Sequence, residues 1–110
     1  MASKGCLKKM KTKILTLLGF AAKAGKLSFG FDAAVYSAKH KKAKLIVFSE
    51  DISPKSQKEI KYYAERYGIE FTVLNGIDIE TVSDAVGKRC GIVSVNDCGF
   101  ADAILETVQG

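Results

Sequence analysis

The sequence predicts an α/β protein with a single three-layer α-β-α sandwich, in which helices cover both faces of a four-stranded, mixed and largely parallel sheet. Three observations support this fold class. The chain has 110 residues, the length of one domain, and 47% of them are apolar, enough for one packed core. Segments with helical spacing alternate along the chain with short strand-like segments. Glycines or helix-capping residues separate most of these segments, and no linker or repeat interrupts them.

The N-terminal segment, residues 1–10, is polar, basic and without an apolar pattern, so we expect a flexible basic tail. Residues 11–108 then form the single domain. Its first element is a helix over residues 11–24, where apolar side chains recur at helical spacing and Gly25 provides a stop.

A short strand and a second helix follow. Residues 27–29 alternate in polarity as in a strand, and Gly30 ends it. Asp32 is a favourable N-cap residue, so the second helix is expected to run from residue 31 or 32 to about Lys41. The end of this helix is strongly basic, which suits the negative end of the helix dipole.

The middle of the chain contains a central strand, a helix and another strand. Residues 45–48 are continuously apolar, as in a strand buried on both faces. Ser53 followed by Pro54 is a helix start signal, and this helix is expected to end at Gly68. Residues 69–74 form the next strand, with alternate apolar side chains on one side.

The C-terminal third continues the alternation. Asp78 is expected to cap a helix that ends within residues 87–91, residues 92–95 form a short strand, and a last helix carries apolar side chains from Ala101 to Val108. The predicted order is therefore helix and strand in strict alternation, with five helices and four strands.

Charge is distributed unevenly along the chain. Residues 1–44 hold eleven lysines and one acid, a net charge of +10, whereas residues 45–110 hold six basic and eleven acidic residues, a net charge of −5; together they give the net charge of +5. This asymmetry favours one face that binds a polyanion such as nucleic acid. The alternative is a chain whose lysines serve solubility alone.

The cysteines and apolar segments exclude several classes of protein. Cys6, Cys90 and Cys98 are odd in number and lack Cys-x-x-Cys spacing, and His40 is the single histidine, which argues against a disulfide scaffold and a zinc site. We expect Cys90 and Cys98 to be small buried residues. The apolar run 14–22 is too short for a membrane span and is followed at once by lysine. A cytoplasmic protein without a metal or cofactor is expected.

Acidic residues at the ends of two predicted strands are the candidates for catalysis. Glu50, Asp51 and Asp97 would lie near each other if both strands ran parallel, and there they could hold magnesium. The interpretation we favour is that they cap helices and turns. A cysteine nucleophile would need His40, which lies in a lysine cluster, so the chain is not expected to be an enzyme.

A glycine-bearing segment offers a binding site of another kind. Gly30 and Asp32 are placed at a helix N-terminus with Lys23 and Lys26 just upstream, and free N–H groups at such a helix end suit phosphates or base edges. The alternative is an ordinary helix cap beside a solvated basic face.

Two segments together resemble a known family. Residues 18–26 (LGFAAKAGK), followed by Gly30 and by residues 43–51 (AKLIVFSED), resemble the kink-turn RNA-binding family of ribosomal proteins that includes L7Ae and L30e, and most closely its small bacterial branch. Residues 97–101 resemble that branch too, and the similarity covers about residues 11–106. The resemblance implies an α-β-α sandwich that binds a sharply bent RNA with tandem sheared G·A pairs.

The binding motif of that family, at the start of the second helix, typically reads Gly-x-Asn/Glu-Glu/Gln-x-x-Lys. Here Gly30 is kept, while Asp32, Ala33 and Tyr36 stand at the three polar positions. An aspartate cannot donate to guanine acceptors, alanine removes a base contact, and tyrosine can stack on a base.

A second contact surface of the family, an apolar loop before the last strand, is nearly absent here, and Lys88 and Arg89 occupy the short connection. The predicted RNA-binding surface therefore comprises Lys26, Gly30, Phe31, Asp32, Ala33, Tyr36, Lys39, Lys88 and Arg89. The expected partner of this ribosomal-protein-like monomer is structured RNA, either ribosomal RNA or a kink-turn element, with a role in translation on or off the ribosome. The alternative is a protein–protein adaptor with an apolar patch of Phe31, Ala33 and Tyr36.

Overall fold

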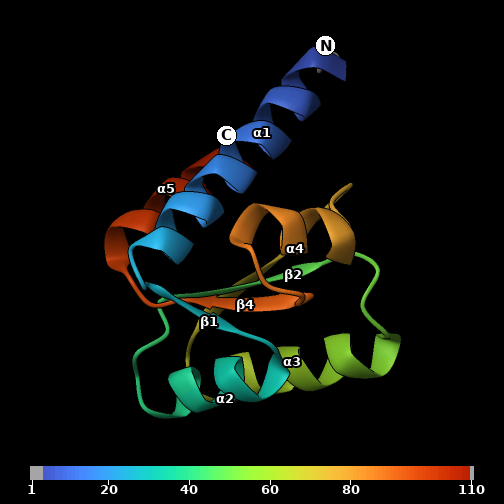
Figure 1. The fold of residues 1–110 in the computed structure, drawn as a ribbon. Helices are drawn as coiled ribbons and strands as arrows, with labels where there is room; N and C mark the ends of the chain where they lie inside the picture. Colours follow the sequence, from blue (N-terminus) through green and yellow to red (C-terminus); the bar gives the residue numbers. More distant parts are fainter. Residues whose placement is uncertain (1–3, 110) are drawn as a thin grey trace.

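A computed structural model describes residues 4–109 as a three-layer sandwich (Figure 1). Helices and strands alternate without exception in this part of the chain, which confirms the predicted fold class. The elements in order are α1 (Lys4–Lys23), β1 (Leu27–Phe29), α2 (Phe31–Lys39), β2 (Leu45–Ser49), α3 (Pro54–Arg66), β3 (Glu70–Leu74), α4 (Ile79–Val86), β4 (Ile92–Val95) and α5 (Cys98–Gln109).

The sheet has the strand order β1-β4-β2-β3 and is mixed. Only β2 and β3 pair in parallel, because β4 lies between β1 and β2 and runs antiparallel to both. The expectation of a largely parallel sheet was therefore wrong. The short α4 does not carry the chain back to the level at which β2 and β3 start, so β4 starts beside the end of β2. There the N–H of Ser49 donates to the carbonyl of Gly91 over 2.8 Å.

Helices α1, α4 and α5 cover one face of the sheet, and α2 and α3 cover the other (Figure 1). The alternation of side chains along the central strand β2 supplies both cores. Leu45 and Val47 pack with α1 and α5, whereas Ile46 and Phe48 pack with α2 and α3. All five residues of β2 are buried, as its continuous apolar run predicts.

Most helix ends follow their predicted signals. Ser53 caps α3 by accepting from the N–H of Ser56 at 3.1 Å, and Asp78 caps α4 by accepting from the N–H of Thr81 at 2.8 Å. Hydrogen bonds from the Thr81 hydroxyl and N–H also lower the pKa of Asp78. The expected N-cap role of Asp32 was wrong, because the N-cap of α2 is Gly30 and Asp32 lies inside the first turn.

Helix α1 starts earlier than the apolar pattern indicates. It begins at Lys4, so residues 4–10, expected in a flexible tail, are helical. Leucine, lysine and methionine have high helix propensity, which extends the helix beyond its amphipathic part. The expectation for residues 1–3 lies outside the described residues. Within residues 4–109, no helix is both long and apolar enough to span a bilayer.

Candidate functional site

Helix α2 presents one exposed stripe to solvent along its whole length. Asp32, Tyr36, Lys39 and His40 are exposed and recur at spacings of three and four residues, so they share one side of the helix. The opposite side is buried against the sheet through Ala34, Ser37 and Ala38. Two of the predicted base-reading residues and one predicted phosphate contact therefore lie in a single row.

Gly30 fixes the point at which this stripe begins. Its backbone has φ 94° and ψ 168°, a conformation that is essentially reserved for glycine. A Cβ built on Gly30 would meet no atom within 4 Å, so the backbone conformation alone selects glycine here, and the backbone is open to a ligand. The N–H groups in the first turn of α2 have no carbonyl of their own helix to bond.

A part-buried polar network holds α2 onto the sheet. Ser37 of α2 and Ser28 of β1 share a hydroxyl–hydroxyl hydrogen bond of 2.8 Å. The side-chain amide of Asn96 donates to Ser28 at 2.9 Å, and its oxygen accepts from Ser94 of β4 at 2.8 Å. Each of these four side chains has a hydrogen-bond partner within the network, so the network fixes how α2 packs on β1 and β4.

The connection between α4 and β4 lies next to the start of α2. The N–H of Gly30 donates to the carbonyl of Ile92 at 2.8 Å, and the Lys88 ammonium lies 5.5 Å from the centre of the Phe29 ring. This cation–π contact places Lys88 beside Gly30, and Arg89 is exposed next to it. We call Gly30, Phe31, Asp32, Ala33, Lys88 and Arg89 the start-of-α2 cluster.

The remaining predicted lysines lie at the other end of the helix. Lys26 immediately precedes β1, and Lys39 is the last residue of α2. The rise per residue of a strand and of a helix places each of them about 13 Å from Gly30 along the chain axis. The backbones of Lys26 and Lys44 flank the end of β4, through bonds to Asn96 and Val95. We call Lys26, Lys39, His40, Lys41, Lys42 and Lys44 the end-of-α2 cluster. The predicted surface is therefore one face with two separate clusters.

Phe31 does not take part in the exposed stripe. It is half-buried, and its ring meets the ring of Tyr63 on α3 edge-on at 6.1 Å. The apolar patch expected for an adaptor, with Phe31 beside Ala33 and Tyr36, does not form, because Phe31 faces the neighbouring helix. Its position in the helix, on the side that packs against α3, is the physical reason.

Tyr36 lies between the two clusters and leans toward the end of the helix. Its ring centre is 4.1 Å from that of His40, and the Lys42 ammonium lies 5.8 Å from the ring. His40 and Lys42 were not among the residues predicted for the site. The four-residue spacing of Tyr36 and His40 on a helix was the signal that could have placed them together.

A family model described as the Ribosomal protein L7Ae/L30e/S12e/Gadd45 family matches residues 12–104, most of the chain. The chain belongs to this family. The matched range includes Gly30 and every element from β1 to β4. The expectation of a non-catalytic protein agrees with membership of this family.

Individual relatives of the L7Ae/L30e family match over most of their length. The RNA-binding protein YlxQ of Enterococcus faecium is 27% identical over 101 residues, which cover 91% of this chain and 95% of the relative. Large ribosomal subunit protein eL30 of Euphorbia esula is 29% identical, with coverage of 94% and 92%. A solved structure of a protein of unknown function from Bacillus halodurans superposes with a TM-score of 0.83 at 25% identity, covering 89% of this chain and 98% of that one.

The acidic residues of this L7Ae/L30e protein act as caps rather than as a group. Glu50 accepts from the N–H of Gly76 at 2.6 Å, Asp51 from the N–H of Ile79 at 2.9 Å, and Asp97 from the N–H of Phe100 at 3.0 Å. Since β2 and β4 are antiparallel neighbours, the end of β4 that Asp97 follows lies beside the start of β2, and Glu50 and Asp51 follow the other end of β2. The arrangement needed for a shared magnesium ion does not arise.

The cysteines differ in their surroundings. Cys90 is buried, and burial raises the pKa of its thiol above the ordinary value, which makes it a weaker nucleophile. Cys98 is exposed at the first position of α5, so the expectation that it would be buried was wrong. Its position before the apolar stripe of α5, on the solvent side of the first turn, explains the difference.

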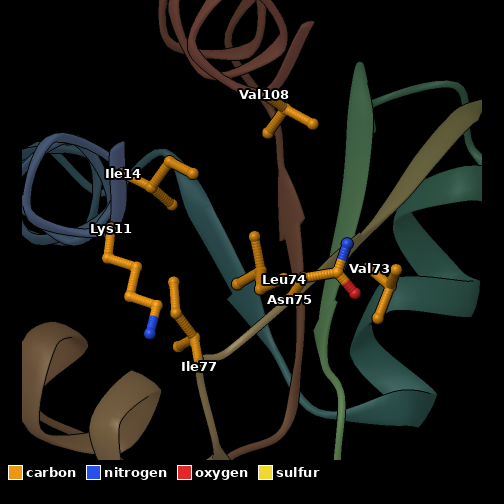
Figure 2. A pocket seen from close by; sticks show the side chains of 7 residues that line it. All are labelled: Lys11, Ile14, Val73, Leu74, Asn75, Ile77 and Val108. Carbon is orange, nitrogen blue, oxygen red and sulfur yellow. The ribbon is translucent and has the colours of Figure 1, made fainter. Parts of the chain in front are cut away.

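One small pocket lies away from α2, between α1, α5 and the end of β3 (Figure 2). Lys11 extends from α1 toward Ile77 and is the single charged residue among those lining it. The other lining residues are Ile14, Val73, Leu74, Asn75, Ile77 and Val108. An apolar pocket with one cation and one amide holds no acid–base or nucleophilic pair, so it offers no chemistry.

Proposed function

We propose that this L7Ae/L30e-family chain is a non-catalytic RNA-binding protein that acts as a monomer and binds a kink-turn or another structured RNA through the exposed stripe of α2. Ribosomal RNA, on or off the ribosome, is the RNA class that fits its relatives. Support comes from the RNA-binding protein YlxQ and the ribosomal protein eL30, which match along nearly their whole length.

The observation that carries the proposal is the start of α2. Gly30 adopts a conformation open to glycine alone, nothing blocks its Cβ position, and the free N–H groups of the first helical turn lie beside Lys88 and Arg89. An unobstructed backbone with nearby cations lets an RNA strand approach closely and be held by its phosphates.

Base reading falls to the side chains just inside this helix. The Asp32 carboxylate only accepts hydrogen bonds, so it can bind the amino group of a guanine but not its O6 or N7. Ala33 contributes no polar contact, and Tyr36 contributes a ring in place of a charge. The kink-turn preference should therefore rest on few base contacts, each worth about 1–3 kcal/mol, or about 5- to 150-fold in affinity.

Phosphate contacts supply the remaining affinity. If Lys26, Lys39, Lys88 and Arg89 each neutralise one phosphate, the logarithm of the binding constant falls with the logarithm of salt concentration by about 0.7–0.9 per contact. Four contacts then weaken binding about 50- to 150-fold between about 50 and 200 mM salt.

A titration of a standard kink-turn RNA at these two salt concentrations, with a straight duplex as control, tests the proposal. Tight binding that prefers the kink-turn supports it in full, and equal, salt-sensitive binding to both RNAs leaves a general RNA-binding protein. Absence of binding at the low salt concentration refutes it. In that case a protein partner captured independently of salt would favour the adaptor function instead.

A further inference from the structure

The end of α2 carries an exposed aromatic pair, with Tyr36 inside the helix and His40 at its C-cap. Tyr36 is 56% exposed, and its ring lies 4.1 Å from that of His40 at an angle of 41°. Neither residue belongs to the two packed cores. Two rings held together at the surface offer an apolar platform of the kind on which unstacked bases lie.

Lysines lie close to this pair in the chain. The Lys42 ammonium is 5.8 Å from the Tyr36 ring, and Lys39 and Lys41 adjoin His40 in the chain. No acid occurs between Asp32 and Glu50 in the sequence. Acids also lie at this end of the molecule. Asp97 follows the end of β4, between the backbones of Lys26 and Lys44, and Glu70 and Asp102 line an open groove with Lys41 and Lys44 on the side toward Tyr67.

Lys41 holds an unusual backbone conformation for its residue type. Its φ is 58°, and it is the single non-glycine residue with positive φ among residues 4–109. A side chain in this left-handed region is less stable than glycine there. The turn therefore carries a cation at a position where glycine would be the easier choice. Lys41 follows His40 directly in the chain and lines the groove on the side toward Tyr67.

From these observations we propose that Tyr36 and His40 form a stacking site for single-stranded RNA, with Lys39, Lys41 and Lys42 binding its phosphates. This inference rests on the proposed function and extends it, because the site lies along α2 from the start-of-α2 cluster. A structured RNA bound at Gly30 would continue as an unpaired strand along the helix to His40. Sequence preference at this site is weak, because every base presents a π-face to a ring.

The experiment compares a kink-turn RNA with the same RNA extended by about ten unpaired uridines, a length within the range bound by single-strand sites. Extensions at either end are measured separately, because the direction of the strand along α2 sets which one reaches His40. For the wild-type protein, one extension is expected to tighten binding about 5- to 150-fold, the effect of stacking one base.

Variants then assign the gain to the aromatic pair. Tyr36→Ala and His40→Ala should each remove most of the gain from the extension, whereas Tyr36→Phe, which keeps the ring, should retain it. The matched control is Phe20→Ala, since Phe20 is also 56% exposed but lies on α1 in the other helical layer. Thermal melting confirms that each variant is folded before binding is measured.

The outcomes separate this inference from the proposed function. If the unextended kink-turn binds but neither extension tightens binding, or if the gain survives in both alanine variants, the stacking site is refuted and the proposed function stands. If neither RNA binds at all, the proposed function fails and the stacking site fails with it.

Discussion

Replacing Gly30 with alanine tests the link between backbone conformation and the start of α2. At φ 94° and ψ 168° an alanine is strained, and such strain costs about 1–3 kcal/mol. Because a Cβ at this position would meet no atom within 4 Å, no steric clash adds to that figure. The loss in the free energy of unfolding therefore contains the backbone strain but no contribution from a steric clash.

A second glycine provides a matched control. Gly87 at the end of α4 has φ 80° and ψ 14°, in the left-handed helical region, and its Cβ position is also empty. That region costs a non-glycine residue about 1–2 kcal/mol. Alanine reduces the entropy of the unfolded chain equally at both sites, so Gly30→Ala should lose more stability than Gly87→Ala.

Urea unfolding at 25 °C, followed by circular dichroism, measures both losses. We expect unchanged slopes and a lower urea midpoint for each variant. A separate thermal melt of Gly30→Ala should show a melting temperature lower by about 4–15 °C. A loss below about 0.5 kcal/mol, or a loss smaller than that of Gly87→Ala, would refute the reasoning that Gly30 is held in a glycine-only conformation.

Three further changes have expected outcomes. Asn96→Ala removes two part-buried side-chain hydrogen bonds and should lower the free energy of unfolding by about 2–3 kcal/mol in a denaturant titration; a loss below about 1 kcal/mol would show that the network does not hold α2. Lys41→Gly should raise stability by up to about 1 kcal/mol yet weaken RNA binding at low salt, and a variant that binds unchanged would contradict a phosphate contact there. In protein with Cys6 changed to Ser, a thiol reagent at pH 8 should modify exposed Cys98 well before Cys90, whose pKa burial raises; equal rates would contradict the burial of Cys90.

Local signals in the sequence predicted the elements of the fold well. The continuous apolar run of β2 and the capping residues Ser53 and Asp78 each determine their element through contacts within a few residues, and the structure confirms all three. The direction of β4 could not be predicted in the same way. The direction of β4 depends on where the C-terminal end of the short α4 lies relative to the end of β2. That position is set by packing between distant segments.

The candidate site was predicted only in part, because local signals again predicted some features and packing between distant segments determined the others. Helical spacing and the family motif place Asp32 and Tyr36 on one stripe, and the structure agrees. The orientation of Phe31 toward Tyr63 and the separation of Lys26 from Gly30 follow from how α2 and β1 pack in three dimensions. A list of site residues from sequence therefore mixes residues that point to different sides of the same element.

The most direct test of the proposed binding surface is an NMR titration of the labelled protein with a kink-turn RNA, which reports which backbone amides change on binding. We expect the largest shifts at residues 30–36 and at Lys88 and Arg89, with small shifts along α1 and α5 on the other face of the sheet. Shifts that cluster on α1 and α5 and leave α2 unchanged would contradict the assignment of the RNA-binding surface to α2.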